Sequence, residues 1–351
     1  MSAYVVMAGE LLDFCRDVLV AAGVPGPDAA LTADCLVRAN LRGIDSHGVS
    51  RLKSYVDRLA SGVMNPVTRI EVISESPATA LVDGGNGLGQ VVGSHAMRMA
   101  IEKAKATGIG FVGARNSNHF GMTAYYAMMA LSHDMIGIAW SNASPAMAPW
   151  GGLDPLLGTN PVAIAVPSGN GYPLVLDMAA TVVARGKIRL AARKGQKIPL
   201  DWAIGPDGTP TDDPVAALAG SLYPIGGPKG YGWALMVEIL CGVLTGAVEL
   251  GSVKPLVDLS GPSGTGHSFC AIDISSFAPV SEFKRRVDSM ISRVKAVRRA
   301  PGIEKIYLPG EIELEAEKIR EKNGIPLSEE VLHDLEDIGR KYNIKGPCKE
   351  S

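Results

Sequence analysis

The chain has 351 residues, 46% of them hydrophobic and 20% charged, which is enough to bury a large core and suggests two domains. Thirty-four basic against 36 acidic side chains give a formal charge of -2, so the chain has no broad electrostatic footprint for nucleic acid or an anionic membrane. Its five cysteines are scattered without a CxxC pair, which argues against a disulfide scaffold or a zinc ribbon. With no signal peptide or membrane-length apolar run evident, these features predict a cytoplasmic protein.

The first part of the chain is predicted to be helical, and the middle to alternate between strands and helices. Amphipathic patterns predict helices over 8–22 and 27–42, and a third from Ser46 towards Leu59. Short β-type runs follow at 69–74, 79–83, 109–113, 135–140, 161–166 and 173–177, with helices at 89–107, 122–132 and 178–192. This alternation indicates an α/β fold in which helices cover a sheet.

The last third is predicted to return to helices. A glycine-rich turn at 226–232 precedes an apolar helix that runs to about residue 246, and a strand follows at 268–273. A charged helix is expected at 281–297, and two exposed helices within 311–342. We expect these C-terminal helices to pack with the N-terminal ones, around a middle part that contains the sheet.

A glycine-rich turn between a predicted strand and a predicted helix, Gly84-Gly85-Asn86-Gly87-Leu88-Gly89, invites comparison with the dinucleotide fingerprint GxGxxG. The spacing is wrong, because the glycines give GxGxG and Gln90 stands where the third glycine belongs. No acidic residue closes a following strand at the expected distance. We therefore interpret the segment as a turn that uses glycine for positive φ, and we expect no Rossmann domain.

The densest chemistry lies in Asp45-Ser46-His47-Gly48-Val49-Ser50-Arg51-Leu52-Lys53-Ser54-Tyr55. A helix that begins with Asp45 or Ser46 as N-cap would place His47, Arg51 and Tyr55 on one face. The guanidinium of Arg51 would bind a carboxylate in a bidentate manner. The imidazole of His47 would exchange a proton near neutral pH, and the Tyr55 hydroxyl would hydrogen-bond a reacting oxygen. The alternative is a capped helix with a solvated polar face.

A second polar segment, Arg115-Asn116-Ser117-Asn118-His119-Phe120-Gly121, is predicted to link a strand to a helix. Ligands of α/β sheets commonly bind at such a position, and the helix terminus would keep His119 neutral and favour anions nearby. The alternative is an asparagine-rich turn with a capping histidine. Among the remaining histidines, His267 is expected in a loop, and no HxH or HExxH spacing predicts a metal site.

Three more segments place polar residues or glycines after a predicted strand end, although each alone is typical of a turn. They are Ser141-Asn142-Ala143-Ser144-Pro145, Asp177-Met178-Ala179, and Gly226-Gly227-Pro228-Lys229-Gly230-Tyr231-Gly232. In the last, Lys229 between glycines would reach a phosphate while the backbone approaches closely.

The ordered series DSHGVSR, RNSNHFG, SNASP, GTNP, LDMAATVVARGKI and GGPKGYG resembles the malate/L-lactate dehydrogenase family of type 2. That family also includes sulfolactate, ureidoglycolate, diketogulonate and piperideine-2-carboxylate oxidoreductases, and it is unrelated to the Rossmann-type lactate and malate dehydrogenases. The resemblance, from about residue 8 to 310, implies a non-Rossmann, sulfolactate-dehydrogenase-like α/β fold. It further implies a helical, substrate-binding and dimer-forming domain of residues 1–75 with 240–351, a cofactor-binding domain of residues 76–239, and a homodimer.

The resemblance also assigns roles to individual residues. It implies His47 and His119 as the active-site histidines, with Ser46, Arg51 and Tyr55 lining the substrate pocket. The cofactor, NAD or NADP, would contact residues from five segments: Asn118, His119, Ser141, Asp177, Met178, Ala179, Lys229, Gly230, Pro309, Gly310 and Glu311. The chain departs from its relatives at His267-Ser268, where an aromatic or an amide is frequent.

The implied reaction is reversible hydride transfer between the nicotinamide cofactor and C2 of a 2-hydroxy or 2-oxo acid of the malate, lactate or sulfolactate type. Negative charge grows on the carbonyl oxygen, so a proton donor must stand close to it. We expect His119 to be that donor, with His47 orienting or sharing the proton and Arg51 holding the carboxylate. The alternative is reduction of a cyclic imine, piperideine- or pyrroline-2-carboxylate; a metal-dependent hydrolase and a non-catalytic binding protein are disfavoured.

Overall fold

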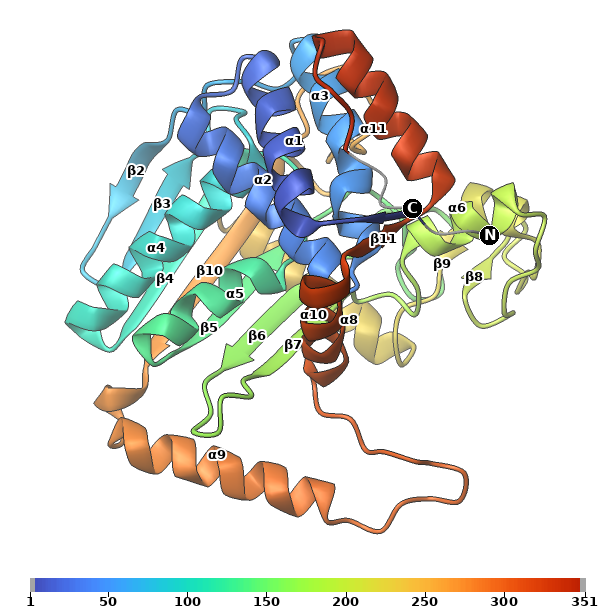
Figure 1. Ribbon diagram of the computed structural model, residues 1–351. Coiled ribbons are helices and arrows are strands. Elements are labelled where there is room, and N and C mark those ends of the chain that lie inside the picture. Colours follow the sequence, from blue (N-terminus) through green and yellow to red (C-terminus); the bar gives the residue numbers. More distant parts are fainter. Residues whose placement is uncertain (1–3, 348–351) are drawn as a thin grey trace.

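A computed structural model describes residues 4–347, with a mixed seven-stranded sheet at its centre (Figure 1). The strand order is β2-β3-β4-β10-β5-β6-β7; β3 and β4 pair in parallel and the other neighbours pair antiparallel. The strands of this sheet are β2 (Glu71–Glu75), β3 (Thr79–Asp83), β4 (Ile109–Ser117), β5 (Met135–Ser141), β6 (Val162–Val166), β7 (Leu174–Met178) and β10 (Thr265–Asp273). Two small sheets join β1 (Tyr4–Val6) to β11 (Ile325–Leu327) and β8 (Ala203–Ile204) to β9 (Ser221–Leu222).

The helices lie on both faces of the sheet and around it. They are α1 (Ala8–Ala21), α2 (Gly26–Leu41), α3 (Leu52–Ala60), α4 (Gly89–Thr107), α5 (Ala124–Met129), α6 (Arg185–Arg193), α7 (Pro214–Ala219), α8 (Pro228–Glu238), α9 (Val280–Lys295), α10 (Glu311–Asn323) and α11 (Glu329–Tyr342). Short 3-10 turns are η1 (Asp45–His47), η2 (Val49–Arg51), η3 (Ala130–His133) and η5 (Ile274–Ser276), and α8 continues into the π-helical turn η4 (Ile239–Val243).

One face of the sheet is covered by α4 and α5 (Figure 1), which pack closely because two strand glycines leave room for their backbones. A Cβ at Gly110 would stand 2.0 Å from the carbonyl oxygen of Ala100, and one at Gly137 would stand 2.1 Å from that of Ala127. The layer between sheet and helices is apolar and made largely of alanine, valine and methionine side chains. The π-helical turn η4 packs on the other face, against β4 and β10.

The two ends of the chain pack together. A second apolar core joins α1, α2 and α3 to α11 and to the β1–β11 pair. In contrast, α9 and the segment that returns from it to α10 form an arm that extends from the body (Figure 1). We refer to residues 277–308 as the arm.

Several expected elements need correction. The helix expected from Ser46 begins only at Leu52, and the one expected over 178–192 begins at Arg185, because Ala180 instead exchanges backbone hydrogen bonds with Thr159 and Ile225. Strand β4 continues to Ser117, so the first three residues of the predicted polar loop are strand, and β10 begins at Thr265, which places His267 in a strand rather than a loop.

Candidate active site

The strand ends that carry the predicted site residues meet at one edge of the sheet. Trp140 of β5, Val162 of β6 and Met178 of β7 stand in register, so β5 and β7 end at the same edge, on either side of the start of β6. His267 of β10 pairs with both Ser141 of β5 and Ala114 of β4. The segments that follow β4, β5 and β7 therefore converge, as ligand-binding segments of an α/β sheet do.

The segment around His47 is bent at Gly48, which changes how its side chains meet. A Cβ at residue 48 would stand 2.0 Å from Oδ1 of Asn40, and that Oδ1 accepts the backbone N–H of Val49 at 2.8 Å. The chain makes two 3-10 turns here before α3 starts, so His47, Arg51 and Tyr55 do not share the face of one helix. The expected cap is also wrong, because the Asp45 carboxylate binds Asn40 and Arg320 instead.

His119 is where these side chains meet. The Tyr55 hydroxyl lies 2.8 Å from Nδ1 of His119, and the His47 ring stacks on the His119 ring with centroids 5.6 Å apart and planes 15° from parallel. The backbone N–H of Gly121 also points at Nδ1, at 3.4 Å. These two contacts occupy Nδ1 and leave Nε2 as the ring atom that can exchange a proton with a ligand.

The Nε2 atoms of His47 and His119 are both available to a ligand. Among the described residues neither has a hydrogen-bond partner, and neither is buried, whereas Nδ1 of His47 is held 2.9 Å from the Ser46 hydroxyl. Ser46 thus orients one histidine and Tyr55 the other. The two stacked imidazoles come from two separate parts of the chain.

Both histidines are held neutral. Burial first, and then the positive charge of Arg51, lowers the pKa of His47 to about 4. Burial, His47, Arg51 and His267 lower the pKa of His119 well below its usual value. The predicted neutrality of His119 therefore has a different origin from the helix terminus we expected, since the first N–H of α5, from Ala124, is occupied by the Asp177 carboxylate at 2.8 Å.

Arg51 presents a free guanidinium edge beside the histidines. Its Nε donates to the carbonyl of Ser46 at 2.6 Å, which leaves the two terminal nitrogens for a ligand. Burial and the neighbouring charge of Arg189 lower the pKa of Arg51, while Tyr55 opposes the shift. The chemistry that this arrangement supports is a bidentate bond to a carboxylate, next to two proton-exchanging rings.

His267, which the sequence left in a loop, is a fully buried part of the site's frame. Its Nδ1 lies 2.9 Å from the Ser141 hydroxyl and its Nε2 2.9 Å from the Ser117 hydroxyl, and its ring stacks on Phe120. Burial lowers the pKa of His267 to about 3. The imidazole therefore links β4, β5 and β10 just behind His119 and does not line an open surface.

The glycine-rich turn at 84–89 has a structural role, as interpreted from its spacing. The Asn118 amide donates to the carbonyls of Asn86 and Gly87, and a Cβ at Gly89 would stand 2.2 Å from the carbonyl oxygen of Asn118. The start of α4 is thus fitted against the backbone that carries His119. The predicted cofactor residue Asn118 is fully buried, and its amide holds this turn.

Gln90, which follows that turn, is a site neighbour that our sequence reasoning missed. Its side chain is fully buried, and neither amide atom has a hydrogen-bond partner among the described residues. It stands beside Tyr55, whose pKa it helps to lower against the raising effect of burial, and near Gly121. The signal in the sequence that could have indicated it is the amide side chain at the start of the predicted helix, in the position where GxGxxG requires its third glycine.

The remaining predicted cofactor residues gather around the end of β7. The carbonyl of Pro309 accepts the N–H of Val175, and Gly310 lies so close that a Cβ there would stand 2.8 Å from Val175. On the other side, Ile225 bonds to Ala180, which brings the Lys229-Gly230 turn to the same place. Asp177 is exposed between them, and its Oδ2 accepts the backbone N–H of Ala124. Glu311 instead forms ion pairs with Lys295 and Lys305.

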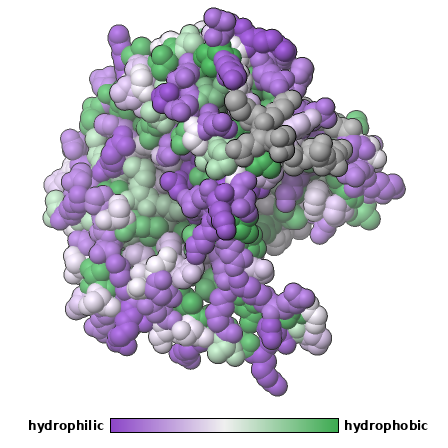
Figure 2. Space-filling model, in the orientation of Figure 1, coloured by the Kyte–Doolittle hydropathy of each residue, from purple (hydrophilic) through white to green (hydrophobic). Residues whose placement is uncertain are grey.

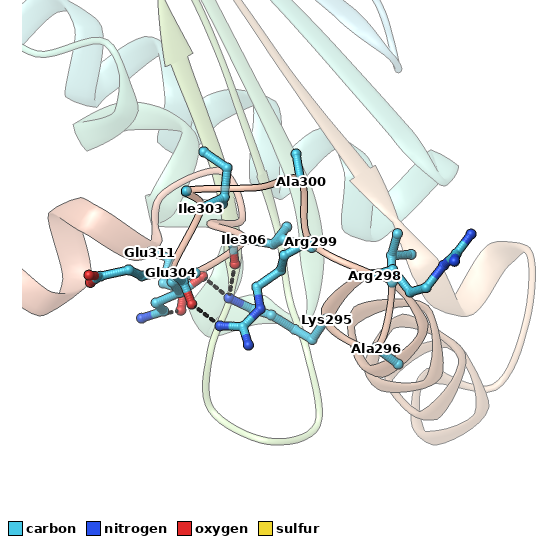
Figure 3. Close-up of a pocket in the computed structure, with 12 residues that line it drawn as sticks. Lys295, Ala296, Arg298, Arg299, Ala300, Ile303, Glu304, Ile306 and Glu311 are labelled. Atoms are coloured by element: carbon cyan, nitrogen blue, oxygen red, sulfur yellow. Dashed lines mark hydrogen bonds and ion pairs between the residues drawn. The ribbon is translucent and has the colours of Figure 1, made fainter.

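A hollow of about 1150 Å³ lies in the arm rather than at this edge (Figure 3). Both of its lysines are already paired, Lys295 with Glu311 and Lys305 with Glu311 and Glu315. Arg299 donates to the carbonyl of Glu304, and Arg298 points away from the others in Figure 3. The hollow therefore offers a ligand few free charges.

Two further findings concern the part of the chain that the structure describes. No group of three or more histidine, cysteine, aspartate or glutamate side chains in residues 4–347 is arranged to hold a metal ion. None of the helices in that range is long and apolar enough to cross a membrane.

Comparison with known proteins agrees with this arrangement. Residues 6–336 match the family model of malate/L-lactate dehydrogenase. The chain is 46% identical to the malate dehydrogenase of Pyrococcus abyssi (strain GE5 / Orsay) over 345 residues, which are 96% of this chain and 94% of that one. It is 47% identical to the L-sulfolactate dehydrogenase of Methanocaldococcus jannaschii over 329 residues, 93% of this chain and 94% of that one.

The fold agrees as well. The solved structure of sulfolactate dehydrogenase from Methanocaldococcus jannaschii superposes with a TM-score of 0.91 at 43% identity, and the match covers 97% of this chain and 98% of that one. The expected sulfolactate-dehydrogenase-like α/β fold is confirmed. The chain belongs to the malate/L-lactate dehydrogenase family and is a nicotinamide-dependent dehydrogenase of hydroxy acids.

Proposed function

We propose that the enzyme interconverts a 2-hydroxy acid and its 2-oxo acid at His119, with His47 and Arg51 beside it. The observation that carries the proposal is the stacked histidine pair, whose two accessible Nε2 atoms adjoin an arginine without a counter-ion. A hydroxyl or carbonyl oxygen placed at Nε2 and a carboxylate placed on the guanidinium are the two groups of such a substrate.

The chain's own residues suit the nicotinamide cofactor at the end of β7. Helix α8 begins without a side-chain cap, after Gly226 and Gly227 with positive φ, and Lys229 forms no ion pair among the described side chains. An uncapped helix start beside a free lysine is suited to a diphosphate. We propose that this turn, Ser141, Asn118, Asp177-Met178-Ala179 and Pro309-Gly310-Glu311 hold the cofactor, NAD or NADP. The bound cofactor supplies or takes up the hydride at C2.

The protein's part in the reaction is to bind, orient and move a proton. Arg51 binds the C1 carboxylate and thereby fixes C2 and its oxygen relative to His119. Tyr55 and Gly121 hold Nδ1 of His119, so the proton that leaves or reaches the substrate oxygen does so at Nε2. The carboxylate also neutralises Arg51, which removes one cause of the low pKa of His119 and makes that ring a better base for the hydroxyl proton.

We propose a homodimer in which α8, η4 and the arm face the partner. Val243 and Leu244 of this surface are 73% and 59% exposed, and Phe277 and Val297 of the arm are 79% and 60% exposed. On the face visible in Figure 2, apolar side chains lie among hydrophilic ones. Large apolar side chains exposed on these elements favour association. Light scattering after size exclusion should give twice the 36.8 kDa chain mass, and Val243→Asp should shift it towards one chain.

Two coarser expectations accompany this proposal. We assign substrate binding and dimer formation mainly to residues 1–75 with 240–351, and cofactor binding mainly to residues 76–239. We also propose a cytoplasmic location, supported by Cys15, Cys35, Cys241 and Cys270, which are buried as free thiols.

The test is an assay of purified enzyme with each candidate substrate and each cofactor. Oxaloacetate, pyruvate, sulfopyruvate and piperideine-2-carboxylate are offered with NADH and separately with NADPH, and oxidation of the cofactor is followed by absorbance. We expect turnover of 2-oxo acids. Turnover of the cyclic imine alone would contradict the proposal.

A further inference from the structure

A second arginine lies near Arg51, contributed by a different element. Gly186, in the first turn of α6, faces Arg51 so closely that a Cβ there would stand 3.9 Å from its Nη2. Residues three positions apart share a helix face, so Arg189 lies on the same side of α6 as Gly186. The charge of Arg189 acts on Arg51, and it also acts on Arg185.

Helix α6 is fixed in this position. Ile188 is fully buried in an apolar cluster with Val183 and Ala146, and the Arg185 guanidinium donates to the carbonyls of Pro145 and Leu218 at 3.1 and 2.7 Å. The Arg185 side chain therefore holds α6 in place and is not free to bind a ligand. Arg189, on the other hand, forms no hydrogen bond or ion pair among the described side chains and remains half-buried.

Two cations held together call for negative charge, and the chain does not provide it. No carboxylate is among the groups that act on the pKa of Arg51, and both histidines beside it are neutral. Asp177 responds to Arg42 and Glu313 rather than to these arginines. Like charges in a partly desolvated site repel unless a ligand brings anions.

We propose that Arg189 binds a second acidic group of the substrate, so that the preferred substrates are 2-hydroxy and 2-oxo acids with a carboxylate or sulfonate beyond C2. This inference rests on the proposed function, in which Arg51 takes the C1 carboxylate. Arg51 from η2 and Arg189 from α6 then each bind one acidic group of a short dianion. The C2 atom of the substrate lies between the two arginines, next to His119. Pyruvate and other monoanions leave Arg189 without a partner.

The test compares substrates with one and two acidic groups in the full-length enzyme. We expect the wild-type kcat/KM for oxaloacetate or sulfopyruvate to exceed that for pyruvate by about 10- to 100-fold, the range of a charged hydrogen bond. Comparison of oxaloacetate with sulfopyruvate shows whether the second group is a carboxylate or a sulfonate. Arg189→Met should abolish the preference while it leaves the kcat/KM for pyruvate within about threefold, and Arg189→Lys should retain part of it.

Lys187→Met is the matched control, since it removes a charge from an exposed position on the same helix and should leave every ratio unchanged. Calorimetry provides a readout apart from turnover: Arg189→Met should weaken the dianion tartronate but not the monoanion oxamate. Equal losses for all substrates, or an altered KM for the cofactor alone, would assign Arg189 to the frame or the cofactor and overturn the inference. If wild-type enzyme reduces no 2-oxo acid, the proposed function fails first, and the inference with it. If 2-oxo acids are reduced but the variant keeps the wild-type ratio, only the inference fails.

Discussion

The histidine site and the arm differ in whether their charged side chains have counter-ions. In the arm, Lys295 and Lys305 meet carboxylates, and the hollow between them is wide but electrostatically satisfied. At the sheet edge, Arg51 is partly buried without a counter-ion, and two imidazoles are held uncharged beside it. A wide hollow therefore does not identify the reactive site in this molecule, whereas an unpaired cation next to free proton-exchanging atoms does.

The largest effect should come from the residue at which the site converges. His119→Ala removes the proton-exchanging Nε2 and should lower kcat/KM for 2-oxo acid reduction by about 100- to 10,000-fold. The exposed His333→Ala serves as the control and should retain wild-type kinetics. Steady-state assays measure both, with circular dichroism to verify folding. Near-normal turnover in both His119→Ala and His47→Ala would show that the histidine site is no more reactive than the arm.

Arg51→Met should act on both affinity and the pH profile. Loss of the charged bond to the carboxylate should reduce kcat/KM by about 10- to 100-fold. The positive charge of Arg51 lowers the pKa of His47 and of His119, so its removal raises both. Reduction needs a protonated donor, and its rate should then persist to higher pH than in wild type. Lys53→Met, an exposed residue paired with Asp57, should leave the profile unchanged; a profile that does not move in Arg51→Met would refute the electrostatic coupling.

His267 should make stability, rather than catalysis, depend on pH. Its pKa is about 3 when folded and 6.5 when unfolded, so below pH 6.5 the unfolded chain binds a proton that the folded chain refuses. The free energy of unfolding should therefore fall by about 1.4 kcal/mol per pH unit on this account as the pH drops from 6.5 towards 3. Denaturant titrations at several pH values give the free energy of unfolding as a function of pH. Between pH 6.5 and 3 this dependence should be shallower in His267→Asn than in wild type, by the equivalent of one proton. Identical slopes would mean that the buried ring titrates normally.

The smallest effect is expected in the arm. Arg298→Gln removes a charge that lines the hollow of the arm but points away from the other side chains there (Figure 3), and kcat/KM should change by less than about twofold. Assays with oxaloacetate and pyruvate measure it. A loss comparable with that of Arg51→Met would show that the arm, too, serves the reaction.

Features of the fold and of the site could be predicted from the sequence where they depend on residues close together in the chain. Helix α4 was placed at its observed bounds, 89–107, because its apolar period is local and a glycine ends it at a left-handed residue. His47 and His119 were found from their own polar segments and from the family motifs around them. Their contact was not, because Tyr55 reaches His119 through space and not along a helix.

The errors have physical causes that a single sequence conceals. The bend at Gly48 follows from the side chain of Asn40, which occupies the space of a Cβ there. His267 looked like part of a glycine-rich loop because strand β10 is recognisable only from the two strands that flank it. Gln90 was read as a failed glycine, since the buried space it fills is created by elements far along the chain.

Strand β10 also has a consequence for biogenesis. It is inserted between β4 and β5, although it follows them by more than a hundred residues in the chain. While the ribosome has yet to release residues 265–273, both neighbouring strands have unpaired inner edges of the kind that recruits other chains. Ser117 and Ser141 also lack the imidazole that later joins them. Cooperative closure of the sheet, and with it the reactive centre, must therefore wait until most of the polypeptide has emerged.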